Sequence, residues 1–224
     1  MRYGLPSPLC KLFAALAVIL SLSAGTATAD TGPDGLTIVA LGDSLTAGYM
    51  LGPDEGFTHQ LQKALKDAGH GNVTVVNAGV SGDTSSGGLA RLDWAVGPEA
   101  DAVIVELGAN DALRAIDPGL TRKNLAEIVS RLKDRGLPVL LAGMLAPPNL
   151  GRDYGESFNS IYPDLAASEG LILYPFFLDG VAGERSLNLA DGIHPTAEGV
   201  GIIVERILPG VEKLIAEAKA RQTQ

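Results

Sequence analysis

The sequence predicts an α/β fold, a three-layer α/β/α sandwich with a central five-stranded parallel sheet. Short apolar runs rich in β-branched residues alternate with longer segments whose apolar residues recur at helical spacing. No long polar linker, internal repeat or low-complexity stretch interrupts this alternation. Strand-then-helix units of this kind form one parallel sheet that has right-handed crossovers and helices on both faces.

Five apolar runs are expected to form the strands. The first, LTIVAL, is stopped by Gly42, and the third, AVIVEL, precedes a loop that begins at Gly108. The expected strands cover residues 36–41, 73–76, 102–107, 138–142 and 171–173.

The segments between these runs have helical periodicity. Gly69 follows the first such segment in the position that a helix C-cap prefers, and Pro209 must kink or divide the last one, residues 196–220. With the strands, these segments describe a flavodoxin-like arrangement of the three layers. The residues at helical spacing are Phe57, Leu61, Ala64, Leu65 and Ala68, then Leu125, Ile128, Val129 and Leu132, then Ile161, Leu165 and Ala166.

Residues 1–29 are expected to be a signal peptide. Arg2 and Lys11 precede an apolar run over residues 12–22, and an Ala-Thr-Ala sequence of small residues ends at Ala29. The run is about eleven residues long, whereas a membrane-spanning helix needs roughly 20, so an uncleaved anchor is the weaker alternative. We therefore predict export to the periplasm or secretion from the cell.

The mature domain, residues 30–224, is long enough to fold without disulfide bonds. It has 195 residues, and a chain of this size buries most of its apolar surface. The only cysteine, Cys10, lies within the predicted signal peptide, so no disulfide is expected. Removing Arg2 and Lys11 takes the formal charge from −9 to −11, and an acidic surface repels nucleic acid and anionic lipid. We expect no nucleic-acid partner, no stable membrane insertion after cleavage, and a monomer.

Three loops at the predicted carboxyl ends of strands carry unusual residues, and doubly wound sheets bind ligands at this edge. The first loop, residues 42–48, reads GDSLTAG. A turn opened by Gly42 can present the hydroxyl of Ser44 to solvent. A serine after a strand is also a common helix N-cap or turn residue, so its neighbours must decide between these alternatives.

The second and third loops can supply hydrogen-bond donors above Ser44. Residues 77–84 place Gly82 where a backbone N–H can approach a ligand closely, and residues 108–111 offer the side-chain amide of Asn110. Each alone is an ordinary turn. Together they provide the preorganised donors that acyl transfer needs, because negative charge develops on the carbonyl oxygen in the transition state.

A DGIHP sequence near the C-terminus offers a base and a carboxylate. Asp191 precedes His194 by three residues across a glycine turn, so its carboxylate can accept the Nδ1 hydrogen and leave Nε2 free for a serine hydroxyl. A surface pair that caps a helix is the alternative. His59 and His70 lack metal-ligand spacing relative to His194, so neither a metal ion nor a cofactor is expected.

Four short motifs occur in the order found in a known family. They are Ser44 in GDSL, Gly82 in SGDT, Asn110 in GAND, and Asp191 with His194 in DGIHP. The chain resembles the SGNH (GDSL) hydrolases, and within them the TesA-like branch of acyl-CoA thioesterase I, lysophospholipase L1 and arylesterase enzymes. The resemblance runs from residue 41 to residue 195 and includes GLARL at 88–92 and IYP at 161–163.

The resemblance implies a role for each motif residue. Ser44 would be the nucleophile, His194 its base, and Asp191 the residue that orients His194. The oxyanion hole would consist of the backbone N–H groups of Ser44 and Gly82 and the side-chain amide of Asn110.

Two positions depart from related patterns. Ala109 stands where close relatives often carry a second glycine, which leaves the fine shape of the oxyanion hole open. Thr46 excludes the G-x-S-x-G surround of an ordinary α/β-hydrolase elbow. The mature chain also contains neither a P-loop nor a dinucleotide-binding glycine motif.

The expected function is hydrolysis of an acyl ester or thioester through an acyl-Ser44 intermediate, without a metal or cofactor. A carbohydrate acetyl-esterase is the alternative among enzymes, but Trp94 is the only tryptophan available to stack on a sugar. A catalytically idle binding protein is the alternative from another class, and the intact motifs disfavour it. A medium or long acyl chain is expected, because Leu113 and Ile116 lie in a segment that resembles the mobile substrate loop of the TesA-like branch. Four further apolar residues support it, although they could equally be core or loop packing: Phe176, Phe177, Leu178 and Val181.

Overall fold

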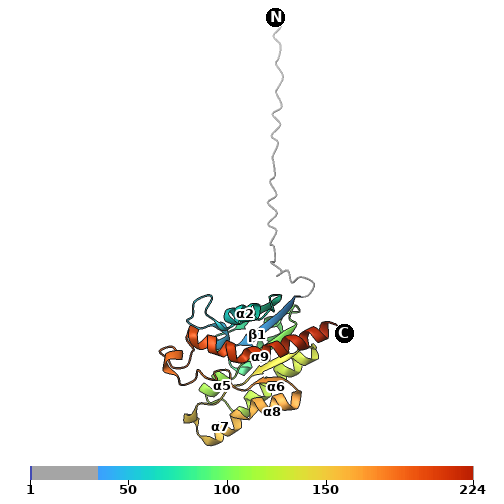
Figure 1. Ribbon diagram of the computed structural model, residues 1–224. Coiled ribbons are helices and arrows are strands. Elements are labelled where there is room, and N and C mark those ends of the chain that lie inside the picture. The colour runs from blue at the N-terminus through green and yellow to red at the C-terminus, as the bar shows by residue number, and fades with distance from the viewer. Residues whose placement is uncertain (2–34, 224) are drawn as a thin grey trace. The chain divides into compact units, whose positions relative to one another are not determined.

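The computed structural model describes residue 1 and residues 35–223, and Figure 1 shows the arrangement of its helices and strands. The predicted signal peptide, Met1 apart, lies outside the described residues, as does Cys10. Among the residues that the structure describes, no helix is long and apolar enough to cross a membrane.

The centre of the fold is a parallel sheet of five strands, as predicted. Its order, β2-β1-β3-β4-β5, is the flavodoxin-like order of doubly wound proteins. All four neighbouring pairs are parallel. The strands are β1 (Leu36–Gly42), β2 (Val73–Gly79), β3 (Ala102–Glu106), β4 (Val139–Ala142) and β5 (Ile172–Tyr174).

Helices cover both faces of this sheet, which confirms the three-layer prediction. α2 (Phe57–Asp67) packs along α9 (Ala197–Gln222) on one face (Figure 1). α3 (Ser85–Ala90), α6 (Pro118–Asp134) and α8 (Ile161–Glu169) form the opposite layer, where α6 contacts both neighbours. The shorter elements are α1 (Ser44–Ala47), α4 (Leu92–Ala95), α5 (Ala109–Leu113), α7 (Arg152–Asn159), η1 (Pro148–Leu150) and η2 (Arg185–Leu187).

The three central strands are buried at every position, whereas the edge strands β2 and β5 are partly exposed. Successive side chains of a strand point to opposite faces of the sheet, so a strand with helices on both faces needs apolar residues throughout. This explains why β1 and β4 read as continuous apolar runs. It also makes Glu106, the last residue of β3, an unusual side chain at such a position.

Of the two outcomes expected at Pro209, a kink or a division, the division does not occur, because α9 continues through the proline. Proline has no N–H for the carbonyl of Glu205, one turn earlier. Both residues are exposed, so water can reach that carbonyl. The opposite side of the helix carries buried Ile207 and Val211, which hold it against the sheet on both sides of the proline.

The topology brings the three predicted loops to one edge of the sheet. Gly42 at the end of β1 pairs in register with Gly79 of β2 and with Glu106 of β3. The segments that leave these three strands are therefore neighbours. The connections reverse direction between β1 and β3, and such a switch point is where doubly wound proteins bind ligands.

Candidate active site

Ser44 lies in a tight turn that joins β1 to α1. Asp43 is the N-cap of α1, and its Oδ1 accepts the Leu45 N–H at 3.0 Å. Gly42 permits this turn, because a Cβ there would lie 2.0 Å from the hydroxyl oxygen of Thr46. The nucleophile candidate is therefore the first residue of a short helix at the carboxyl end of a buried strand.

The structure brings the predicted serine, histidine and aspartate into one hydrogen-bonded chain. His194 Nε2 lies 2.9 Å from Ser44 Oγ, and His194 Nδ1 lies 2.7 Å from Asp191 Oδ2. In the tautomer that carries its hydrogen on Nδ1, Nδ1 donates to the carboxylate and Nε2 accepts from the hydroxyl. This geometry suits a base that removes the serine proton.

The DGIHP turn keeps Asp191 ionised. Its Oδ1 accepts the backbone N–H groups of Ile193 and His194 at 2.9 and 3.0 Å. These two bonds, followed by the bond from the His194 ring, lower the pKa of Asp191 to about 2. The carboxylate at Nδ1 of His194 is therefore charged, which is the state that a protonated imidazole would need beside it.

The donors expected at the oxyanion position come from three adjacent segments. Ser44 N–H opens α1, where the first N–H groups have no acceptor within the helix. Gly82 lies in the second loop with a φ of 85°, a conformation that favours glycine. Asn110 lies in the first turn of α5, a short helix where the sequence suggested a loop.

The amide of Asn110 connects the first two loops. Its Nδ2 donates to Asp43 Oδ2 at 3.0 Å and to the Asp83 carbonyl at 2.9 Å. Both hydrogens of the amide have acceptors in this structure, so donation to a substrate oxygen requires one bond to be shared or exchanged. Such adjustments are common when a substrate enters an active site.

A pair of buried carboxyl groups lies beneath the Ser44 turn, and the sequence reasoning missed it. Asp43 and Glu106 are both fully buried. Glu106 Oε2 accepts the Thr46 hydroxyl at 2.8 Å and the Asp43 N–H at 3.3 Å. Burial raises the pKa of Asp43 to about 6, and burial with the neighbouring Asp43 charge raises that of Glu106 well above its ordinary value. The glutamate in AVIVEL was the available signal.

Arg91 is a second residue whose role the sequence did not reveal, although it lies in the GLARL segment. Its guanidinium is buried and pairs with Asp83 at 2.5 Å. It also donates to the carbonyls of Ala78 and Gly42, each at 2.8 Å. One side chain thus ties the ends of β1 and β2 to the loop that carries Gly82.

Asp111 and Ser85 lie close in sequence to Asn110 and Gly82, but they hydrogen-bond outside the proposed site. Asp111 Oδ1 accepts the Ser85 hydroxyl at 2.5 Å and the Thr121 hydroxyl at 3.0 Å, and all three residues are buried. Neither Asp111 nor Ser85 is therefore placed to replace Asp191 or Ser44.

An apolar cavity of about 470 Å³ is lined by residues that include the sequence neighbours of Asn110 and His194, Ala109 and Ile193. Ala109, the departure from the related pattern, is among its lining residues. Phe177 and Val181, two of the residues proposed for an acyl site, are instead fully buried core, and the carbonyl of Ile116 accepts the Tyr154 hydroxyl. The main apolar lining residues are Leu113, Met144, Leu145, Phe176, Leu178 and Ile193.

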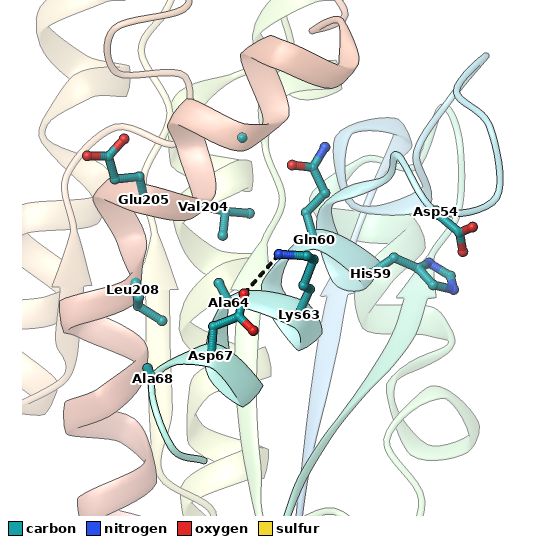
Figure 2. A pocket seen from close by; sticks show the side chains of 11 residues that line it. Asp54, His59, Gln60, Lys63, Ala64, Asp67, Ala68, Val204, Glu205 and Leu208 are labelled. Atoms are coloured by element: carbon teal, nitrogen blue, oxygen red, sulfur yellow. Dashed lines mark hydrogen bonds and ion pairs between the residues drawn. The ribbon is translucent and has the colours of Figure 1, made fainter. Parts of the chain in front are cut away.

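A larger cavity, about 680 Å³, lies between α2 and α9 and contains none of the predicted site residues. Figure 2 shows Ala64 of α2 facing Val204 and Leu208 of α9 across it. The charged residues at its rim include an ion pair of Lys63 and Asp67 at 2.8 Å. Volume alone therefore does not identify the site.

The described part of the chain has no group of three or more His, Cys, Asp or Glu side chains arranged to hold a metal ion. His70, one of the histidines considered for metal binding, lies 3.5 Å from Glu212 instead.

Comparisons with known proteins agree with this geometry. Residues 40–202 match the GDSL-like Lipase/Acylhydrolase family. The chain is 42% identical over 180 residues to Esterase TesA of Pseudomonas aeruginosa, which covers 80% of this chain and 89% of that protein. It is 36% identical to Thioesterase 1/protease 1/lysophospholipase L1 of Escherichia coli strain K12, with 80% and 85% covered.

The fold also matches a solved structure. The crystal structure of TesA superposes with a TM-score of 0.75 at 41% identity, and the match covers 80% of this chain and 99% of that one. The motif resemblance, the five-stranded parallel sheet and these relatives lead to one assignment. The chain belongs to the GDSL-like lipase/acylhydrolase family, the SGNH hydrolases.

Proposed function

We propose that this protein hydrolyses acyl esters and thioesters through a covalent acyl intermediate on Ser44. Its family and its similarity to proteins named esterase and thioesterase support the reaction class. The observation that carries the proposal is the chain from Ser44 through His194 to Asp191, with contacts of 2.9 and 2.7 Å. A serine hydroxyl bonded to a base that a carboxylate orients is the arrangement that activates a nucleophile.

The reaction has two halves. In the first, Ser44 Oγ attacks the acyl carbonyl while His194 Nε2 takes the hydroxyl proton, and Asp191 stabilises the imidazolium. Collapse of the tetrahedral intermediate breaks the bond to the alcohol or thiol, which receives that proton from His194. In the second, water attacks the acyl group on Ser44 with His194 again as base, and the acid is released.

The negative oxygen of each tetrahedral intermediate needs donors. We assign this role to the N–H groups of Ser44 and Gly82 and to the Asn110 amide, which already lies between the two loops that carry them. Such preorganised donors stabilise the transition state more than the substrate.

The apolar cavity beside the site is suited to a medium or long acyl chain. It is lined by Leu113, Phe176 and Leu178 from the proposed set, together with Met144 and Ile193. Cavities lined by apolar side chains with polar groups at one end bind ligands of this shape. We also propose that residues 1–29 direct export, so that the enzyme acts in the periplasm or outside the cell.

The decisive experiment compares the wild type with Ser44→Ala. A fluorophosphonate should label the wild type and not the variant, and hydrolysis of p-nitrophenyl esters should disappear with unchanged circular dichroism. Labelling that persists at Ser81 or Ser85 would overturn the assignment of the nucleophile.

A substrate panel tests the acyl specificity. Rates for p-nitrophenyl esters from acetyl to palmitoyl, acyl-CoA, lysophospholipid and acetylated xylan should peak at a medium or long chain. A maximum for acetyl groups, with turnover of the xylan, would favour a carbohydrate acetyl-esterase instead.

A further inference from the structure

We propose that Tyr49 is a positioning residue for His194 and stabilises the imidazolium that forms during the reaction. The two ring centroids lie 4.6 Å apart, with 40° between the ring planes. This inference rests on the proposed function, because it assigns a partner to the proposed base. Nothing in the sequence singles out Tyr49, which follows the GDSL motif by only a few residues.

The backbone fixes the place of this ring. The Tyr49 N–H and the Gly48 N–H both donate to the Ser44 carbonyl at 3.1 Å. Gly48 ends α1 in the left-handed conformation, with a φ of 79°, and this reverses the chain immediately before the tyrosine. Tyr49 is therefore attached to the nucleophile through its backbone and touches the base through its side chain.

The face of the aromatic ring provides an interaction that the other neighbours of His194 do not. Asp191 lies at the ring edge, at Nδ1, and Ser44 lies at Nε2. Asp43, beneath the Ser44 turn, is a further charged group that interacts with this imidazole, and Glu106 in turn interacts with Asp43. A cation within about 6 Å of an aromatic centroid is attracted by the negative ring face.

This contact strengthens during the reaction. His194 is neutral before it takes the Ser44 proton and cationic afterwards, so the attraction favours the tetrahedral stage over the bound substrate. Because the two ring centroids are only 4.6 Å apart, the Tyr49 ring also limits the space into which the imidazole could rotate away from Ser44. Both effects act on kcat and leave substrate binding largely unchanged.

The test compares Tyr49→Leu, which removes the ring, with Tyr49→Phe, which keeps it. Trp94→Leu is the control, because Trp94 is an exposed aromatic residue on α4, outside the site. Steady-state kinetics on a soluble p-nitrophenyl ester are measured across pH. We expect kcat of Tyr49→Leu to fall roughly 2- to 30-fold with KM within about twofold.

Two further results are expected. The acid limb of kcat/KM in Tyr49→Leu should move to lower pH, because the imidazolium loses a stabilising partner. The kcat values of Tyr49→Phe and Trp94→Leu should stay within about twofold of wild type, and their acid limbs should not move. A purely structural role would lower stability without moving that limb. NMR titration of ¹⁵N-histidine-labelled protein should show the same displacement for His194 without any substrate.

Several outcomes would overturn the inference. They are an unchanged kcat and titration in Tyr49→Leu, a loss in Tyr49→Phe equal to that in Tyr49→Leu, or a rise in KM alone. Failure of the proposed function is distinguishable, since the wild type would then neither hydrolyse esters nor react with fluorophosphonate. The NMR titration would still decide the contact between Tyr49 and His194.

Discussion

Asp191 and Asp43 both hydrogen-bond to residues of the proposed site, yet their environments shift the pKa values of the two carboxyl groups in opposite directions. Asp191 lies on a partly exposed turn, and hydrogen bonds from Ile193 and His194 lower its pKa to about 2. Asp43 is fully buried beside Glu106, and burial raises its pKa to about 6. Asp43 accepts a hydrogen bond from the amide of Asn110, whereas Asp191 is hydrogen-bonded to the imidazole of His194.

The comparison shows that environment separates the roles of two identical residue types. A carboxylate that must stabilise an imidazolium has to remain ionised, and the N–H groups of its own turn ensure this. Asp43 also accepts a backbone N–H, from Leu45, but desolvation outweighs that bond. Asp191 should therefore govern catalysis, and Asp43 should govern the pH dependence of stability.

The largest expected effect is that of Asp191→Asn on kcat, a loss of about 10⁴, as known for a comparable triad. The amide reverses the hydrogen-bond demand on Nδ1 and favours the tautomer that cannot accept the Ser44 proton. Steady-state kinetics with circular dichroism measure the loss in folded protein. Asp134→Asn is the control, because that aspartate ends α6 before β4 begins, at the opposite edge of the sheet. A variant that keeps more than a tenth of wild-type kcat would show that Asp191 does not orient the base.

Asn110→Ala tests the side-chain amide that donates to Asp43 and that we assign to the oxyanion hole. We expect kcat to fall roughly 10²- to 10³-fold, about 2.7–4 kcal/mol, with KM little changed, because an oxyanion donor acts in the transition state. Kinetics over a range of substrate concentrations separate the two parameters. If KM rose at constant kcat, Asn110 would be a ground-state contact and backbone groups alone would form the oxyanion hole.

The buried carboxyl should make the protein less stable as pH rises from about 4 to 7. A pKa raised from 3.8 to about 6 means that the folded state holds a proton that the unfolded state has released. Ionising Asp43 in the fold then removes about 3 kcal/mol of unfolding free energy by pH 7. Urea unfolding of wild type and Asp43→Asn across this range measures the difference. We expect the difference in unfolding free energy between the two proteins to change with pH. A difference that stays constant across the range would contradict the prediction.

The smallest expected effect is that of Asp191→Asn on stability. In contrast to Asp43, it should change the unfolding free energy at pH 7 by less than about 1 kcal/mol. The side chain of Asp191 is 37% exposed, and solvent screens its interactions. Its lowered pKa contributes stability above pH 3.8 that disappears as pH falls through about 2. Urea unfolding at both ends of this range is the measurement. A loss of several kcal/mol at pH 7 would make Asp191 primarily a structural residue.

Local pattern predicted most of the elements because their apolar periodicity is strong. The strands and the long helices were found with boundaries close to those observed, since each buries a continuous apolar run or stripe. α7 was missed, because its sequence RDYGESFN is mostly polar and only Phe158 is buried. Pro209 was expected to kink or divide the last helix, and it does not divide it, because burial on the opposite helix face outweighs one missing hydrogen bond.

By itself the sequence determined the family, the order of the four motifs and the identity of the residues that could react. These are properties of short segments, in which spacing alone brings Asp191 to His194 and places Ser44 at the end of a strand. The tertiary structure decided which distant groups meet. The register of β1 with β3 places Glu106 under Asp43, and the loop after α1 places Tyr49 on His194. Strand order decides which of these groups meet, and burial in the assembled fold decides the pKa values of those that ionise. Neither can be read from a single segment of sequence.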